Sequence, residues 1–125
     1  MRLPLEKPVV LRRVELRGPA RRHQVDLILD TGAAYTIISW EVARFLGCDP
    51  AISRRRISLI TANGVIEVPL VKLKSLGIGG ITVKDIEVAC HDIPELTGVD
   101  GLLGLNALDR LNLKLNFRDG YMEIE

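Results

Sequence analysis

Cysteine, long apolar runs and an excess of either charge are lacking in this sequence, and each absence excludes a class of protein. The two cysteines, Cys48 and Cys90, are too few and too far apart for a disulfide framework or a zinc site, and reduced thiols are typical of a cytoplasmic protein. Residues 1–8 contain no apolar run long enough for a signal peptide or a membrane span. Basic and acidic side chains nearly cancel, leaving a net charge of +1 and no overall field to recruit nucleic acid. We therefore expect a soluble, cytoplasmic protein without a metal, another cofactor, a nucleic-acid partner or a membrane segment.

What the sequence does contain is aliphatic: isoleucine, leucine and valine dominate and aromatic residues make up only 4%, a composition that favours a sheet-rich core. A chain of 125 residues can bury about two thirds of its unfolded surface around one core. We expect a single domain over residues 1–125, with its core in residues 9–125. Short alternating apolar stretches, separated by turn residues and without a βαβ rhythm, predict an all-β fold: a closed barrel-like sheet with one or two short helices.

Local patterns predict the individual elements of this sheet. Ser39 is a candidate N-cap and Gly47 a candidate helix end, so residues 40–46 should form a short helix. The apolar alternation changes phase after residue 83, which predicts a β-bulge near Lys84 and Asp85. The predicted strands cover residues 9–17, 24–29, 36–38, 57–73 as a hairpin, 81–88, 111–117 with one buried face, and 121–125, and a second helical turn covers residues 106–110.

The most informative stretch is residues 25–33, an apolar strand that runs directly into a carboxylate on a tight turn. An ionised carboxylate beside apolar neighbours needs hydrogen bonds, and the residues after Asp30 can supply them. Thr31 offers a hydroxyl, and Gly32 lets the backbone bring an amide towards the acid. Taken alone, the tripeptide is also explained by an ordinary turn in which Asp30 caps its own backbone.

A second motif lies downstream, in residues 99–108. It is an apolar run punctuated by Gly101 and Gly104 and followed by Asn106. An Asp-Thr-Gly-Ala turn followed by an apolar, apolar, Gly, x, Asn, x, Leu segment resembles the retropepsin-like aspartic peptidases, the retroviral protease and its cellular and bacterial relatives. The likeness covers residues 24–121 and is closest to bacterial single-domain members.

The resemblance implies an aspartic endopeptidase with Asp30, Thr31 and Gly32 as its catalytic residues. Aspartic proteolysis uses two carboxylates that share one proton. The chain has one Asp-Thr-Gly, and neither Asp26 nor Asp100 has a turn that would aim it at Asp30. The second carboxylate would then be Asp30 of another copy across a two-fold axis, so the implied partners are a peptide or protein substrate and a second copy in a homodimer.

The resemblance also assigns the residues that would bind substrate. Asn63 and Gly64, between two β-rich arms, are a strong hairpin signal, and in this family the hairpin is a flap that closes over the bound peptide. Substrate contacts are implied for Ala33, Thr61, Ala62, Asn63, Gly64 and Leu103.

One residue departs from the family pattern, because many relatives carry a hydroxyl residue where this chain has Ala34. A non-proteolytic peptide-binding module or a dimerisation domain on the same barrel is therefore an alternative. Three other motifs have simpler explanations: the arginines at 54–56 as a solvated strand edge, residues 77–80 as a turn, and residues 90–92 as adjacent strand residues facing opposite sides rather than metal ligands.

Overall fold

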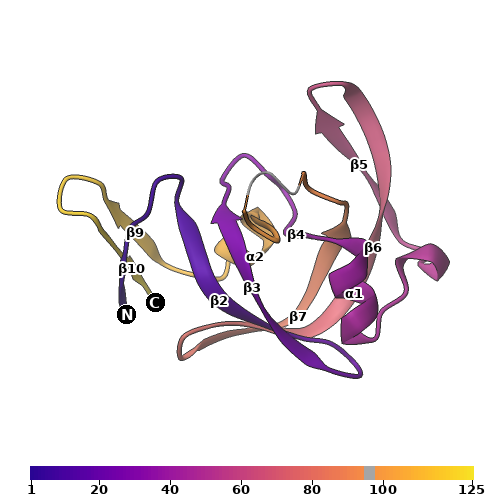
Figure 1. Ribbon diagram of the computed structural model, residues 1–125, viewed down its shortest axis with the longest axis horizontal. Helices are drawn as coiled ribbons and strands as arrows, with labels where there is room; N and C mark the ends of the chain where they lie inside the picture. The colour runs from indigo at the N-terminus through magenta and orange to yellow at the C-terminus, as the bar shows by residue number, and fades with distance from the viewer. Residues whose placement is uncertain (95–97) are drawn as a thin grey trace.

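The computed structural model describes residues 1–94 and 98–125 of the chain (Figure 1). Within these residues it contains ten strands, two α-helices and one 3-10 helix. The elements are β1 (Arg2–Pro4), β2 (Val10–Arg17), β3 (Arg22–Leu29), β4 (Ile37–Ile38), α1 (Trp40–Leu46), η1 (Pro50–Ile52), β5 (Arg56–Thr61), β6 (Gly64–Ile78), β7 (Ile81–Cys90), β8 (Gly101–Leu103), α2 (Leu105–Leu108), β9 (Leu113–Asn116) and β10 (Tyr121–Ile124).

Six of the strands close into a barrel, which confirms the predicted all-β fold. They are hydrogen-bonded in the order β2, β3, β8, β4, β7, β6, and β6 pairs again with β2 to complete the circle. The β3–β8 and β4–β7 pairs are parallel, and the other barrel pairs are antiparallel. β5 pairs only with β6, so the β5–β6 hairpin projects beyond the barrel (Figure 1). Among the described residues β5 therefore has no strand partner on its outer side.

Aliphatic side chains fill the barrel, as the composition predicts. A smaller apolar cluster of Ile37, Val68, Leu70 and Ala89 supports the base of the β5–β6 hairpin. Close-packed interiors of this kind hold the strand ends in fixed positions. The largest fully buried side chains are Leu11, Val14, Leu16, Leu27, Ile38, Leu46, Leu73, Leu76, Ile86, Leu103, Met122 and Ile124.

The two ends of the chain meet in a separate three-stranded sheet beside the barrel (Figure 1). β1 pairs with β10, which pairs with β9, all antiparallel. The sequence predicts no element in residues 1–8, because a three-residue strand shows no apolar alternation. The prediction for 111–117 was wrong at Phe117, whose side chain is 54% exposed. The strand ends at Asn116 and the chain turns away through Gly120, which has a φ of 75°.

The irregular strand lies in a different place from the one the sequence predicts. Leu73↔Ile86 and Ser75↔Lys84 have the same register, so no residue is inserted between β6 and β7 there and the predicted bulge near residues 84–85 was wrong. Asp85 has a φ of 51°, and the buried faces of both strands change phase together there. The register shift is instead in β2, between Leu11 and Val14, where Arg13 has a φ of 56°.

The residues predicted to begin and end the first helix do so in the structure. The α1 helix spans Trp40–Leu46, as predicted. The Ser39 hydroxyl accepts a hydrogen bond from the Val42 amide at 3.1 Å, and Gly47 ends the helix with a φ of 100°.

The predicted turn at 77–80 is confined to Gly79 and Gly80, because β6 continues to Ile78. In the described part of the chain, no helix has the length and apolar character needed to cross a membrane.

Both cysteines are free thiols, Cys48 half-buried and Cys90 buried. Burial raises the pKa of the Cys90 thiol to about 12, with Cys48 and Asp92 adding to the effect, and burial also raises the pKa of Cys48. Since the thiolate is the reactive form, we expect a thiol reagent at about pH 8 to leave Cys90 unmodified in the folded chain. Counting modified thiols with and without denaturant checks this. Full labelling of Cys90 at the same rate in both conditions would contradict it.

Candidate active site

The Asp30 turn sits directly at the end of β3, and its carboxylate is held by the turn's own backbone. The side chain is half-buried, and its Oδ1 accepts a hydrogen bond from the Gly32 amide at 2.9 Å. The Ala33 amide donates to the Asp30 carbonyl at 3.2 Å. Gly32 is exposed, and a Cβ there would lie 3.2 Å from the Asp30 Oδ1. The glycine therefore allows the close approach of an amide to the acid that the sequence predicts.

The second sequence motif supports this turn from behind. β8 runs parallel to β3 with Leu103 opposite Leu29, and the Asp30 amide donates to the Leu103 carbonyl at 3.0 Å. Directly after β8, the Leu105 amide donates to the Ala33 carbonyl at 2.8 Å. The two motifs, far apart in sequence, thus form one hydrogen-bonded unit.

A buried polar network ties the same unit to β7. Thr36 is completely buried, and both its amide and its hydroxyl donate to Asn106 Oδ1, at 2.8 and 3.0 Å. The Thr36 hydroxyl in turn accepts from the Gly104 amide at 3.1 Å. The Asn106 side-chain amide donates to the Glu87 carbonyl at 2.5 Å. Both polar groups of the Asn106 side chain are therefore used in fixing the turn after Asp30.

Replacing Thr36 with Val is expected to lower the free energy of unfolding by about 2 kcal/mol, because the Gly104 amide loses its buried acceptor and Asn106 loses a donor. Urea unfolding followed by the fluorescence of Trp40, the only tryptophan, measures it. Thr36→Ser keeps the hydroxyl and is the matched control, expected to lose much less. Equal losses in the two variants would mean that the methyl group, not the network, carries the stability.

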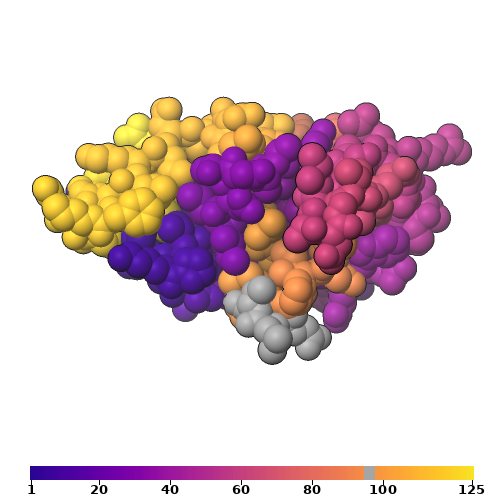
Figure 2. All heavy atoms as spheres, turned by 90° about the horizontal axis from the view of Figure 1, so that it is seen from above, coloured from indigo at the N-terminus to yellow at the C-terminus, as the bar shows by residue number. Residues whose placement is uncertain are grey.

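A cleft of about 490 Å³ opens in front of Asp30, between its turn and the β5–β6 hairpin. Asp30 is the only carboxylate among the described residues that line it. Figure 2 looks onto this end of the molecule and shows the segment after β3 and the hairpin on the same face. The lining residues are Asp30, Gly32, Ala33, Ala34, Ile37, Ser58, Leu59, Ile60, Thr61, His91, Ile93 and Leu102.

The structure brings together some of the residues assigned from the sequence and separates others. Asp30, Gly32, Ala33 and Thr61 share the cleft, whereas Thr31 is exposed on the turn outside the lining. The hairpin tip residues 62–64 are exposed beyond the cleft. Leu103 is fully buried, and its neighbour Leu102 faces the cleft instead. Adjacent strand residues point to opposite faces, so one position decides which leucine can touch a ligand.

Several lining residues were not identified from the sequence. Ser58, Leu59 and Ile60 come from β5, and His91 and Ile93 follow β7. Ile60 is 88% exposed, which is unusual for a large aliphatic side chain within a strand. The available signal was the predicted hairpin itself, since residues near its tip share one end of the molecule with the Asp30 turn.

The hairpin turn differs in detail from the predicted Asn-Gly turn. Thr61 pairs with Gly64, so the two turn residues are Ala62 and Asn63. Gly64, one position later, carries the positive φ of 118°. The Thr61 hydroxyl accepts from the Asn63 amide at 3.3 Å and donates to the Gly64 carbonyl at 2.9 Å. The Thr61 side chain therefore stabilises the turn through hydrogen bonds to backbone groups of the turn itself.

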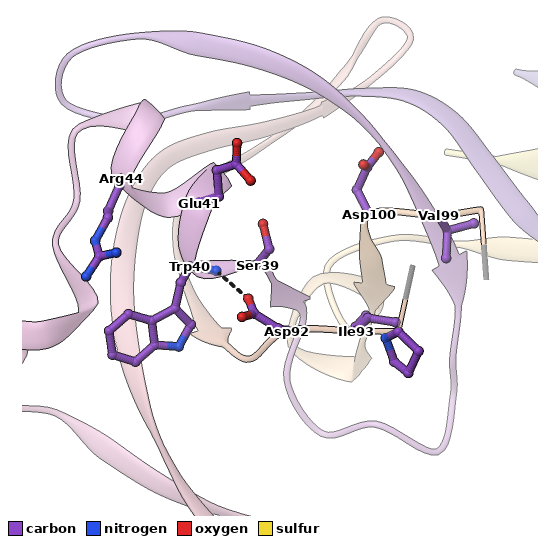
Figure 3. Close-up of a pocket in the computed structure, with 9 residues that line it drawn as sticks. Ser39, Trp40, Glu41, Arg44, Asp92, Ile93, Val99 and Asp100 are labelled. Atoms are coloured by element: carbon purple, nitrogen blue, oxygen red, sulfur yellow. Dashed lines mark hydrogen bonds between the residues drawn. The ribbon is translucent and has the colours of Figure 1, made fainter. Parts of the chain in front are cut away.

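A larger cavity of about 770 Å³ lies beside α1 and does not include Asp30 (Figure 3). It is lined by three carboxylates, those of Glu41, Asp92 and Asp100, together with Trp40 and Arg44. Asp92 is already engaged, because its Oδ1 accepts a hydrogen bond from the Trp40 amide at 3.1 Å, drawn as a dashed line in Figure 3. Among residues 1–94 and 98–125, no group of His, Cys, Asp or Glu side chains is placed to hold a metal ion.

The two other acids near the motifs are also engaged away from Asp30. The Asp26 carboxylate accepts hydrogen bonds from the Arg12 guanidinium and the Arg13 amide, both at 3.1 Å. Asp100 Oδ2 accepts from the Asp26 amide at 2.8 Å. Asp26 thus fastens the irregular part of β2, and neither acid lines the Asp30 cleft.

These features define a class: a closed barrel with an Asp-Thr-Gly turn in a cleft beside a β-hairpin is the architecture of retropepsin-like aspartic proteases. The chain belongs to an aspartyl protease family of this class, since the family described as "gag-polyprotein putative aspartyl protease" matches residues 18–110.

One solved structure has the same fold, and one further protein is similar in sequence. The crystal structure of a retropepsin-like aspartic protease from Rickettsia conorii superposes with a TM-score of 0.69, over 100% of this chain and 97% of that one, at 21% sequence identity. An uncharacterized protein in the cobV 5' region of Sinorhizobium sp. is 30% identical over 89 residues, which are 71% of this chain and 37% of that protein. The chain therefore spans little more than a third of that relative.

Proposed function

We propose that the chain is an aspartic endopeptidase whose catalytic dyad is formed by Asp30 of two copies. The observation that carries this proposal is a half-buried Asp30 as the only carboxylate among the described residues lining the cleft. Hydrolysis by this chemistry needs two carboxylates that share a proton, because like charges a few ångströms apart cannot both ionise. A single copy does not supply the second one, so a homodimer would complete the site.

In the proposed reaction, one Asp30 carboxylate accepts a proton from a water molecule that attacks the peptide carbonyl. The other, protonated Asp30 donates to the carbonyl oxygen, which gives a tetrahedral diol. The Asp30 that took the water proton then passes it to the peptide nitrogen as the C–N bond breaks, and the other Asp30 takes back a proton from the diol as it becomes the product acid. The Gly32 amide holds Asp30 Oδ1 at 2.9 Å, which fixes the orientation of the acid before substrate binds. Thr31, exposed on the turn, would brace the turn of the second copy.

Substrate binding is proposed to occur by strand addition on β5. Within the described chain this strand has no partner on its outer side, and its residues 58–61 line the cleft. An extended peptide can therefore hydrogen-bond to the free edge while alternate side chains enter pockets. In this arrangement the hairpin is the flap, Thr61, Ala62, Asn63 and Gly64 close over the peptide, and Ala33 lies beside it. Leu103, being buried, would act through its carbonyl contact with the Asp30 amide.

The test is cleavage of a mixed peptide library from acidic to neutral pH at several protein concentrations. A rate that rises faster than linearly at low concentration supports a dimeric site. Mixing the parent with an excess of the Asp30→Asn variant should then lower the parent's activity, because mixed dimers hold one carboxylate. Asp85→Asn is the matched control for this mixing, since Asp85 is exposed, makes no side-chain hydrogen bond or ion pair within the described residues, and has the φ of 51° that asparagine tolerates.

The alternative functions predict other outcomes. Binding of library peptides without cleavage at any pH, by folded protein, would indicate a peptide-binding module, and self-association without either would indicate a dimerisation domain. The two free thiols agree with action in a reducing, cytoplasmic compartment, which is part of the same proposal.

A further inference from the structure

A shallow, positively charged hollow lies at the tip of the β2–β3 hairpin. It has a volume of about 320 Å³ and is lined by Arg17, Arg21, Arg22 and Lys74, with no acidic side chain among the described lining residues. Figure 1 shows this hairpin tip at the opposite end of the barrel from the turn that follows β3. Along β3, Arg22 and Leu29 are separated by roughly 23 Å at the rise of an extended strand. The hollow is therefore distinct from the Asp30 cleft.

Sheet register brings these cations together. Arg17 on β2 is directly opposite Arg22 on β3. On the other side of β2, Arg17 is opposite Ser75 on β6, which is adjacent in sequence to Lys74. Lys84 on β7 continues the same row opposite Ser75. Like charges directly opposite each other destabilise an antiparallel pair. A chain with a net charge of only +1 thus concentrates unfavourable charge at one place, which points to a role other than folding.

The charge of the hollow is scarcely neutralised. In the described chain, Glu15 is the one acid paired with a cation of the hollow, and its Oε1 is 3.9 Å from Arg17 Nη2, too long for a hydrogen bond. Asp85 on β7 lies across from Lys74, between the pairs Leu73↔Ile86 and Ser75↔Lys84, but the described residues hold no ion pair between Asp85 and Lys74. Within the described residues, Arg22 and Lys74 make no ion pair. The arginine run at 54–56 is different, because Arg55 and Arg56 are paired with Glu87 and Glu67.

The backbone of the hollow is also fixed in advance. The Leu46 carbonyl at the end of α1 accepts hydrogen bonds from the Ala20 amide at 3.0 Å and the Arg21 amide at 3.4 Å. A Cβ at Gly18 would lie 2.3 Å from the same carbonyl oxygen, so the tip packs tightly on α1. The Arg21 guanidinium is itself anchored by donating to the Phe45 carbonyl at 2.9 Å. A preorganised site loses less entropy when a ligand binds.

We propose that this hollow binds a ligand with two or more linked phosphate groups, either free or as a lipid headgroup. Guanidinium groups bind phosphate through paired hydrogen bonds, and an ammonium adds a point charge. Four cations around one small hollow match a compact, multiply charged anion. An acidic peptide fits less well, since its single charges are spread along an extended chain.

The experiment titrates the full chain with inorganic tripolyphosphate by calorimetry. The double variant Arg17→Gln/Arg22→Gln should weaken binding by about tenfold for each arginine. A control with the same change in charge, Arg54→Gln/Arg118→Gln, alters exposed arginines outside the hollow and should bind like the parent. The urea midpoint of Arg17→Gln/Arg22→Gln should not fall, because the substitution removes a repulsion. Asp30→Asn should bind normally, since this proposal does not depend on the protease site.

Sedimentation with phosphatidylcholine vesicles, with and without phosphatidylinositol bisphosphate, separates the two sources. Binding that needs the bisphosphate lipid and is displaced by tripolyphosphate supports a headgroup, and binding of tripolyphosphate alone supports a free ligand. Four results would overturn the proposal: no tripolyphosphate binding by the parent, an equal loss in the control variant, equally tight binding of an oligoglutamate peptide, or a lower urea midpoint in Arg17→Gln/Arg22→Gln.

Discussion

Replacing Asp30 with Asn is expected to reduce peptide hydrolysis by about a thousandfold while leaving the fold intact. A carboxamide cannot accept the proton of the attacking water, and loss of a general acid–base group costs about two to four orders of magnitude. The fold should survive because the carboxamide still offers an oxygen to the Gly32 amide, the one side-chain hydrogen bond of Asp30 in the described structure. Initial rates on the best peptide from the library, with the urea midpoint of each protein, measure both parts.

The matched control for this prediction is again Asp85→Asn, which makes the same chemical change at an exposed position. It should keep both the parent's rate and its stability. Residual activity of Asp30→Asn within a few-fold of the parent would remove Asp30 from the chemistry. A collapse of its urea midpoint would show instead that the acid holds the turn together, and the loss of rate would then say nothing about catalysis.

Local signals explain why part of the fold could be predicted. The α1 helix is specified within nine residues, by Ser39 at its start and Gly47 at its end, and both act through backbone groups of the same segment. The β5–β6 hairpin is likewise marked locally by Asn63 and Gly64, although the turn itself is made one position earlier, by Ala62 and Asn63. No local signal specifies β1 or the irregular part of β2. β1 forms by pairing with β10, and the conformation of Arg13 depends on a hydrogen bond to Asp26 in the next strand.

In the candidate active site, too, features encoded by adjacent residues could be predicted and features that depend on long-range pairing could not. The Asp30 turn could be predicted, since the acid, the hydroxyl and the glycine are consecutive. The walls of the cleft could not, because Ile60 and Leu102 reach it from different strands and nothing in either sequence segment marks them. The phosphate-binding hollow could not be predicted for the same reason. In the sequence, Arg22 is simply a solvated arginine near a hairpin tip. Only the strand register places Arg17 opposite it, with Ser75 and the adjacent Lys74 on the other side of Arg17. Long-range pairing, not residue type, carries this information.

A large loss of stability is expected from Gly104→Ala. Gly104 is buried, and a Cβ there would lie 2.4 Å from both the carbonyl carbon and the oxygen of Tyr35 and 2.8 Å from the Thr36 nitrogen. All three are backbone atoms, which cannot rotate away as the end of a side chain can, so the chain between Asp30 and β4 must shift. Overpacking of this kind in a close-packed interior is expected to lower the free energy of unfolding by about 3 kcal/mol.

The same shift is expected to reduce hydrolysis beyond what instability explains, because the Leu105 amide next to Gly104 holds the Ala33 carbonyl in the Asp30 turn. Urea unfolding followed by Trp40 fluorescence gives the stability, and rates measured well below the unfolding midpoint give the second effect. Gly80→Ala is the matched control, since a Cβ at Gly80 would meet nothing within 4 Å. If Gly104→Ala is as stable as Gly80→Ala, the two motifs are not packed backbone against backbone, and support of the Asp30 turn by β8 and α2 would have to be abandoned.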